Sequence, residues 1–354
     1  MSVNYVTISW NRSKRFYDAA MIAFSLIYLA SFVIIAKVAF PAPGNLADEV
    51  LAIRALGSLA IILLHITLAI GPAARLWPSL LPLLYNRRHL GVFTFLIALA
   101  HAGLSTVYYH GFGNANPIIS LLATAEQTVS LATLPYQLFG AGALITLFFM
   151  AATSHDFWLK NLSQRVWKNL HMLVYVAYVL LIAHVAFGAM QVERATLPTI
   201  LVIAGAVVLV ILHILAGIRE RTIDRSPATA ASDNWLDAGD LATIPDTRAR
   251  IILAPGGERI AVFRNGQTAS ALTNVCAHQG GPLGEGKIVD GCATCPWHGF
   301  QFHPETGCAP PPFTDRVRTY PVRITAGRVE VCSTPAPIAA DAAPQTPTAG
   351  GTHG

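Results

Sequence analysis

Long apolar runs separated by short polar segments dominate the first two thirds of the chain. Each run has about 20 residues, which is enough to cross a hydrocarbon core about 30 Å thick as a helix. Six such runs occur, at 18–40, 51–70, 90–109, 136–153, 170–189 and 199–218. Segment 75–85, which Pro78 and Pro82 interrupt, and segment 117–124 are predicted to lie along the membrane interface. The pattern predicts an all-α bundle of six transmembrane helices.

The pattern changes after residue 218, where the long apolar runs end and the composition becomes that of a soluble protein. Short apolar stretches such as 260–263 have the length of strands, and an all-β domain outside the membrane is expected here. Only 12% of the 354 residues are charged and 53% are hydrophobic, whereas soluble proteins have about 25% charged residues. We therefore expect a multi-domain protein with an N-terminal segment 1–17, a transmembrane domain 18–220, a linker 221–233, a β-domain 234–334 and a disordered tail 335–354.

Basic residues favour one side of the predicted bundle. The N-terminus, alternate loops and the segment after the last run contain Arg12, Lys14, Arg15, Arg75, Arg87, Arg88, Lys160, Arg165, Lys168, Arg219, Arg221 and Arg225. By the positive-inside rule this side is the cytoplasm, so both termini are predicted to be cytoplasmic in a multi-pass protein of a bacterial-type inner membrane. Because these residues are dispersed over short loops, the net charge of +5 does not indicate nucleic-acid binding.

Histidines within the apolar runs are candidate cofactor ligands, because ionisable side chains inside a membrane are rare and usually functional. His65, His101, His184 and His213 lie well inside their runs, and His171 lies near the cytoplasmic end of the fifth. His171 and His184 are separated by about 19.5 Å along a helix axis, which suits two stacked hemes. They also differ by about 140° in azimuth, so the helix must be locally rewound or the hemes must approach from different sides.

The depth of each histidine in the bundle predicts which histidines pair. His101 has the depth of His184 in the outer half, and His65 has the depth of His171 in the inner half. His213 occupies a similar inner depth and is a spare candidate. The alternative is that each histidine hydrogen-bonds between helices without binding a cofactor.

Residues 50–190 resemble the ferric reductase-like transmembrane domain. The resemblance rests on RRHLG at 87–91, Ala100, His101, Trp167, His171 and His184. This superfamily includes ferric reductases, NADPH oxidases and the heme subunit of the periplasmic methionine sulfoxide reductase system. The resemblance implies one or two b-type hemes, with His101, His171 and His184 as axial ligands. The family's second histidine on the third helix would fall at Arg87. Three alternatives remain for the inner heme: His65 takes the place of the missing ligand, Arg87 is itself the ligand, or the inner heme is absent.

Two short motifs near the C-terminus contain metal ligands. Cys276-x-His278 is followed, after sixteen residues, by Cys295-x-x-His298. Two thiolates on one iron and two imidazoles on the other are the ligands of a Rieske [2Fe–2S] cluster. Zinc also binds two cysteines and two histidines, but the glycines and prolines around each half are typical of Rieske loops. The motifs predict that Cys276, His278, Cys295 and His298 hold a Rieske cluster.

Residues 234–333 as a whole resemble a Rieske ferredoxin-type domain, with a proline loop at 310–312 in the place of the loop that covers the cluster. Respiratory Rieske proteins have a disulfide between the two cluster loops, and here Gly281 and Trp297 occupy its positions. Those proteins also place hydroxyl groups near the cluster, where this chain has Phe300 and Phe302. Fewer hydrogen bonds to sulfur imply a potential at the low end of the Rieske range. The remaining cysteines are predicted to be free thiols, namely Cys292, Cys308 and Cys332.

The Rieske domain stands where relatives have a flavin and nicotinamide reductase. No G-x-G-x-x-G run follows a strand, so no flavin or NAD site is expected on this chain. A separate cytoplasmic reductase or ferredoxin is expected to donate electrons. The leading hypothesis is a transmembrane electron-transfer oxidoreductase that serves a periplasmic metal ion, oxygen or partner protein.

Two alternatives stay open at the level of sequence. The first is a redox-sensing membrane protein without turnover, and the second is a quinol-fed donor to a cytoplasmic oxygenase. Membrane lipid is an expected partner in every case, and a quinone is a candidate partner. No residue beyond the redox ligands is predicted to be catalytic.

Overall fold

The computed structural model describes residues 12–39, 47–123, 136–154, 158, 161–188, 196–225, 228–232, 234–297, 299–311 and 313–337. Its contacts divide the chain into two compact units, a helical unit that ends at Gly217 and a second unit that begins at Ile218. Residues 1–11 of the predicted N-terminal segment and residues 338–354 of the predicted tail lie outside the described residues.

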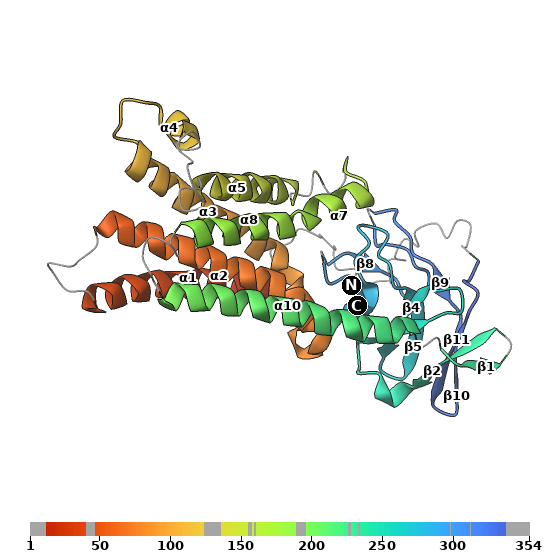
Figure 1. The fold of residues 1–354 in the computed structure, drawn as a ribbon. Coiled ribbons are helices and arrows are strands. Elements are labelled where there is room, and N and C mark those ends of the chain that lie inside the picture. The colour runs from red at the N-terminus through yellow and green to blue at the C-terminus, as the bar shows by residue number, and fades with distance from the viewer. Residues whose placement is uncertain are drawn as a thin grey trace, which may run out of the picture. The chain divides into compact units, whose positions relative to one another are not determined.

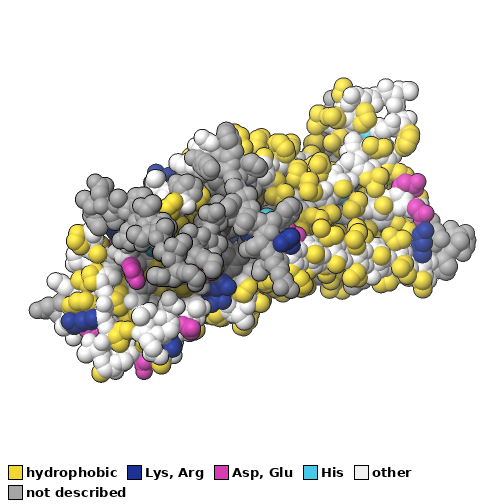
Figure 2. Space-filling view, turned by 180° about the vertical axis from the view of Figure 1, so that it is seen from behind, with side chains coloured by type: hydrophobic (Ala, Val, Ile, Leu, Met, Phe, Trp, Pro, Cys, Tyr) yellow, Lys and Arg dark blue, Asp and Glu magenta, His cyan; other side chains and the backbone are white. Residues whose placement is uncertain are grey.

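The helical unit contains six helical segments that are long and apolar enough to cross a membrane. They are α1 (Arg12–Ala39), α2 (Asp48–Leu76), α3 (Arg87–His110), α5 (Tyr136–Thr153), the pair α7 (Gln164–Met172) and α8 (Val174–Phe187), and α10 (Thr196–Arg225). Figure 1 shows them side by side, and Figure 2 shows that apolar side chains predominate on the helical part of the face in view. The prediction of six transmembrane helices is confirmed by length and composition.

The two segments predicted to be unable to span form short helices. The 3₁₀ helix η1 (Pro78–Asn86) follows α2, and α4 (Pro117–Ala123) follows α3. Pro82 lies inside η1 and has no backbone N–H, which disfavours a continuous α-helix there. These elements are therefore connections between the long helices.

Helix α2 is the centre of the helical unit. In α2, 56% of the most apolar window is buried, compared with 6% in α1. Leu59 and Leu63 of α2 belong to one apolar cluster with η1 and α3, and Leu64 and Leu68 belong to another with α5, α8 and α10. Because α2 takes part in both clusters, it packs against several helices of the unit.

The fifth span is broken at Leu173. Helix α7 ends at Met172 and α8 begins at Val174, so His171 and His184 lie on different helical segments. A straight helix would hold these two side chains at a fixed difference in azimuth. The interruption at Leu173 leaves open whether the helix is rewound between the two histidines or whether two hemes would approach from different sides.

The second unit is all-β apart from the end of α10 and two short 3₁₀ turns, which confirms the predicted fold class. Its strands are β1 (Ala230–Ser232), β2 (Trp235–Asp240), β3 (Ala249–Leu253), β4 (Arg259–Asn265), β5 (Thr268–Thr273), β6 (Lys287–Val289), β7 (Cys292–Thr294), β8 (Gln301–Phe302), β9 (Thr319–Tyr320), β10 (Val322–Thr325) and β11 (Arg328–Cys332). They form three antiparallel sheets in the orders β1-β2-β11-β10, β3-β4-β5-β9 and β6-β7-β8. The small third sheet carries the loop between β7 and β8, and β5 of the second sheet leads into the loop before η5 (Leu283–Glu285).

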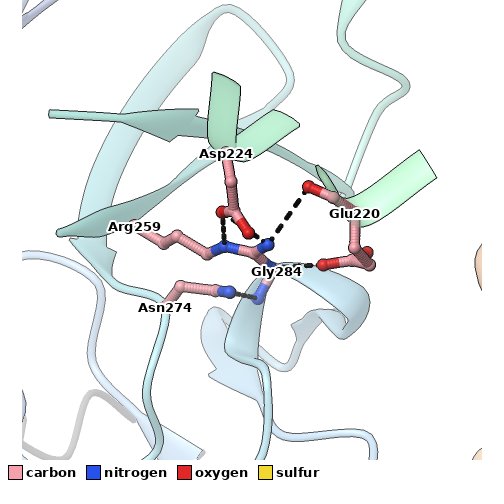
Figure 3. A network of polar contacts seen from close by, with 5 residues as sticks. All are labelled: Glu220, Asp224, Arg259, Asn274 and Gly284. Atoms are coloured by element: carbon pink, nitrogen blue, oxygen red, sulfur yellow. Dashed lines mark hydrogen bonds and ion pairs between the residues drawn. The ribbon is translucent and has the colours of Figure 1, made fainter. Parts of the chain in front are cut away.

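Much of the predicted linker 221–233 has regular structure. Helix α10 continues to Arg225, and β1 begins at Ala230. The last two turns of α10, from Ile218 onward, belong to the same compact unit as the strands. An ion-pair network of Arg259 with Glu220 and Asp224 explains why the helix continues so far (Figure 3).

Candidate redox sites

The two metal-ligand motifs lie in two loops with the same backbone pattern. The first loop joins β5 to the 3₁₀ turn η5 (Leu283–Glu285), and the second joins β7 to β8. In each loop the cysteine N–H donates to the carbonyl five residues later, from Cys276 to Gly281 at 2.9 Å and from Cys295 to Phe300 at 2.8 Å. The cysteine carbonyl then accepts from the N–H four residues later, that of Gly280 or Gly299.

Glycine at this fourth position is required by the backbone. Gly280 has φ +70° and Gly299 has φ +72°, in the left-handed region that side chains disfavour. Each loop therefore needs both a cysteine and a glycine four residues later. The sequence contained this signal in both motifs, but only the structure shows what the glycines do.

The two cysteines predicted to be ligands meet in the protein interior. Cys276 and Cys295 are each 1% exposed. A hydrogen bond with Cys295 lowers the pKa of the Cys276 thiol, burial opposes this effect, and the backbone N–H groups of His278 and Gln279 lower the pKa further. The lower pKa favours the thiolate, which is the form that binds metal.

The residues present fit a [2Fe–2S] cluster. Two adjacent buried sulfur atoms can bind one iron, and the ring of His278 is held by stacking on Phe300 at 4.5 Å between centroids and 7° between planes. A Cβ atom at Gly281 would lie 2.7 Å from Sγ of Cys295, so only glycine leaves room beside this ligand. His298, the fourth predicted ligand, lies outside the described residues.

Aromatic side chains surround the first loop. Phe300 is 1% exposed and Phe302 is fully buried, and Phe300 contacts Phe302 and Phe313 with centroids 5.2 and 5.0 Å apart. Pro310 and Pro311 precede Phe313, and Pro312 lies outside the described residues. This apolar surrounding supports the expectation of a low potential for a Rieske cluster.

The other cysteines form no disulfide within the described structure. Cys292 is buried, and its Sγ lies 3.6 Å from Nδ1 of His303. Burial raises the pKa of the Cys292 thiol, and Asp290 raises it further. A higher pKa disfavours the thiolate, which is the reactive form of a cysteine.

His101 and His184 form the second candidate site, in the helical unit. Their ring centroids are 6.4 Å apart and their planes make an angle of 80°. Two imidazoles on opposite sides of one metal, with bonds of about 2 Å, have ring centres roughly 6 Å apart. Nδ1 of His101 donates to the carbonyl of Ile53 at 2.9 Å, and Nδ1 of His184 donates to that of Tyr136 at 2.8 Å. These bonds leave both Nε2 atoms as electron-pair donors, as axial heme ligation requires.

A glycine four residues after each accepting carbonyl makes room for the histidine ring. A Cβ atom at Gly57 would lie 2.9 Å from Cε1 of His101, and one at Gly140 would lie 2.7 Å from Nδ1 of His184. The same arrangement thus occurs twice, on α2 with Ile53 and on α5 with Tyr136. Sequence reasoning missed both glycines, because glycine is common in apolar membrane helices.

Replacing Gly140 with alanine is expected to reduce heme binding about tenfold, in the range seen when a group that orients a metal ligand is lost. The added methyl group would displace His184 from the carbonyl of Tyr136. Gly103→Ala is the control, because no atom lies within 4 Å of its Cβ position. Heme per chain, measured by pyridine hemochrome after expression with added heme, distinguishes the variants. Equal heme content in Gly140→Ala and Gly103→Ala would contradict the inference that Gly140 makes room for the ring of His184.

The structure does not bring His65 and His171 together. Nδ1 of His65 donates to the carbonyl of Ile61, so its Nε2 accepts from the hydroxyl of Tyr178 at 3.0 Å. His171 stacks on Trp167 at 3.9 Å, and its Nε2 lies 3.3 Å from Oγ of Ser154. The predicted inner pair is therefore not formed among these contacts.

His213, the spare candidate, has the same kind of partner as His65. Its Nδ1 donates to the carbonyl of Leu209, and its Nε2 accepts from the hydroxyl of Tyr175 at 3.0 Å. Tyr175 and Tyr178 are one turn apart on α8, and no sequence pattern connected them with histidines of other helices. His65 and His213 thus both make hydrogen bonds between helices, of the kind weighed as the alternative for each histidine.

Comparison with known families agrees with the division into a helical unit and a β-domain. Residues 234–321 match the Rieske [2Fe-2S] domain, and residues 56–182 match the ferric reductase like transmembrane component. The chain is thus a membrane redox protein that joins a ferric reductase-like transmembrane domain to a Rieske [2Fe–2S] domain, and its C-terminal part belongs to the Rieske family.

Particular relatives match each part separately. Over 107 residues the chain is 41% identical to the anthranilate 1,2-dioxygenase ferredoxin subunit of Burkholderia cepacia, covering 29% of this chain and 94% of that protein. Over 131 residues it is 32% identical to the protein-methionine-sulfoxide reductase heme-binding subunit MsrQ of Ralstonia nicotianae. That match covers 37% of this chain, which spans only about half (55%) of the relative.

Two solved structures that the chain resembles contain a ferredoxin. The ferredoxin of Sphingomonas yanoikuyae B1 is 27% identical, with 28% of this chain and 98% of that chain covered and a TM-score of 0.26. A complex of reduced oxygenase and oxidized ferredoxin in carbazole 1,9a-dioxygenase is 26% identical, with coverages of 30% and 98% and a TM-score of 0.28.

Proposed function

We propose that this chain is the transmembrane component of an electron-transfer oxidoreductase. A cytoplasmic Rieske domain receives electrons, and the helical unit delivers them to an acceptor on the opposite face of the membrane. The observation that carries the proposal is the facing pair His101 and His184, with ring centroids 6.4 Å apart in a chain that also has a Rieske domain.

Each cofactor has a defined set of protein ligands in this proposal. Cys276, His278, Cys295 and His298 hold the Rieske cluster, and the pair described above holds a b-type heme. When bound, both groups supply one-electron redox chemistry, and their surroundings in the protein set their reduction potentials. The chain itself holds the imidazoles in the ligating tautomer through backbone carbonyls. The match to a heme-binding subunit supports the heme.

A heme on the inner side would use His171. Among the described side-chain bonds its Nε2 contacts only the hydroxyl of a serine. Binding a metal through this atom would therefore break only that one weak hydrogen bond. His65 is a poorer candidate, because ligation would break its bond from Tyr178. The second axial position would then fall to a group other than His65, with Arg87 the alternative drawn from the sequence. One heme per chain is the minimum that the proposal requires.

Both termini lie in the cytoplasm in this proposal, and the protein crosses a bacterial-type inner membrane. The excess of arginine and lysine in alternate loops supports this orientation. A cytoplasmic reductase or ferredoxin donates electrons. A periplasmic metal ion, oxygen or partner protein accepts them, and the apolar helices contact membrane lipid.

Electron flow in the opposite direction is a second candidate function. It is favoured by the likeness of the Rieske part to a dioxygenase ferredoxin subunit. In this direction a quinol feeds the helical unit, and the Rieske domain reduces a cytoplasmic oxygenase. A redox sensor without turnover is a third candidate, which differs from both in having no acceptor turnover.

Heme and iron content of the purified full-length protein test the proposal. We expect at least one heme b by pyridine hemochrome and one [2Fe–2S] cluster by electron paramagnetic resonance (EPR). The midpoint potentials then give the direction, since a cluster potential below that of the heme supports flow toward the heme. The absence of heme after expression with added heme would contradict the proposal, and a cluster potential above that of the heme would favour the second candidate.

A further inference from the structure

Arg259, the first residue of β4, binds two acidic side chains on the last two turns of α10. Its Nη2 lies 2.7 Å from Oδ1 of Asp224, its Nε donates to the same oxygen at 2.8 Å, and its Nη1 pairs with the carboxylate of Glu220 (Figure 3). Glu220 and Asp224 are four residues apart and so lie on one face of the helix. All three residues belong to the same compact unit.

This network is more protected from solvent than comparable ion pairs of the β-domain. The side chain of Arg259 is 25% exposed, compared with 45% for Arg323 and 57% for Arg328 in their pairs. Partial burial opposes the charge of Arg259, but the bonds with Glu220 and Asp224 outweigh it and raise the pKa of Arg259. A guanidinium that donates several N–H groups to carboxylates fixes the relative orientation of the paired side chains and also pairs their charges.

The backbone of Arg259 is bonded in turn to the first cluster loop. Its carbonyl accepts from the N–H of Asn274 at 2.8 Å. The carbonyl of Asn274 accepts from Leu283 N–H at 2.8 Å, and its side-chain Oδ1 accepts from Gly284 N–H at 2.7 Å. Asn274 is 4% exposed, and these two bonds close the loop that contains Cys276 and His278; Figure 3 shows the bond to Gly284.

A continuous series of bonds therefore runs from the end of α10 to the loop that holds two cluster ligands. We propose that Arg259 and Asn274 are positioning residues that link the last turns of α10 to the first cluster loop, so that opening the Arg259 network changes the redox properties of the cluster. The inference rests on the proposed function in so far as the loops hold a Rieske cluster. Neither residue touches the metal ligands through its side chain in the described contacts, so the effect is transmitted by loop geometry.

The test uses the full-length protein in detergent and compares four main forms of it, with Arg259→Lys as a fifth. These are the wild type, the double variant Glu220→Gln with Asp224→Asn, Asn274→Ala, and the control Arg323→Gln. Arg323 also pairs with a carboxylate, that of Glu330, but in the sheet that carries neither cluster loop. Three quantities are measured: cluster content by iron and visible absorption, the cluster's EPR spectrum and midpoint potential, and amide hydrogen exchange at Leu283 and Gly284.

We expect Asn274→Ala to speed exchange at the Gly284 amide about tenfold, as the loss of one net hydrogen bond predicts, whereas the Leu283 amide keeps its bond to the backbone carbonyl of residue 274. The double variant keeps its cluster but exchanges these amides faster than wild type and shifts both the EPR spectrum and the potential. Arg323→Gln leaves all three quantities unchanged. Arg259→Lys, which keeps the charge without the planar fork, falls between wild type and the double variant.

Two results would overturn the link. In one, the double variant has the amide exchange, EPR spectrum and potential of wild type while Asn274→Ala does not. Asn274 would then close the loop locally, without a link to α10. In the other, Arg323→Gln shifts the midpoint potential as much as the double variant does. The shift would then come from any change of charge in this unit and not from the link to the loop. A wild-type protein that binds no cluster would instead refute the proposed function, and the iron analysis distinguishes this failure from the other two.

Discussion

Replacing His184 with alanine is expected to abolish heme binding between α3 and α8. One of the two facing imidazoles is then missing, and His101 alone cannot complete axial ligation from both sides. Pyridine hemochrome analysis of purified protein, expressed with added heme, measures the loss per chain. If the wild type contains one heme, the variant has none, and if it contains two, the variant retains one.

Control variants separate ligand loss from general damage to the bundle. His213→Ala removes a histidine whose Nε2 accepts from Tyr175, and His65→Ala removes one that accepts from Tyr178. Both are expected to retain heme at the wild-type level. Loss of heme from His65→Ala with retention in His184→Ala would reverse the assignment and make His65 the ligand.

The angle of 80° between the two rings adds a spectroscopic expectation. Nearly perpendicular axial imidazoles give a strongly anisotropic low-spin ferric EPR signal, whereas parallel ones give a resolved three-line spectrum. Wild-type protein is expected to show the strongly anisotropic form, and this signal should be missing from His184→Ala. A three-line rhombic signal from the wild type would contradict the ring geometry.

Gly281→Ala is expected to prevent assembly of the Rieske cluster. The new Cβ would lie 2.7 Å from Sγ of Cys295 and 3.1 Å from Cδ2 of Trp297. The backbone cannot easily withdraw, because the carbonyl of Gly281 accepts from Cys276 N–H at 2.9 Å. Either the sulfur ligand or the loop must move, so iron content and the EPR signal of the reduced cluster should fall to background.

Gly256→Ala is the matched control for this variant. It lies in the turn between β3 and β4 of the same unit, and no atom is found within 4 Å of its Cβ position. Its iron content should equal that of wild type. Full cluster content in Gly281→Ala would show that the loop adapts to a side chain at this position.

The sequence determined the features that depend on neighbouring residues. Each cluster motif lies within a few positions of the chain, so the ligands and the glycine four residues after each cysteine follow from local backbone bonds. The membrane helices follow equally from continuous apolar length, because a bilayer demands about 20 such residues whatever their neighbours. The resemblance to two families could be drawn on these local patterns alone.

The tertiary structure decided the contacts between residues far apart in the chain. Helix packing places Ile53 beside His101 and Tyr136 beside His184, in both cases 48 residues apart. It also gave His65 a tyrosine partner where depth alone predicted His171, because depth says nothing about which helices are adjacent. The link from Arg259 to Asn274 likewise arises only where helix end, strand and loop meet. Such contacts depend on side-chain shape and on neighbours from distant segments, which periodicity does not encode.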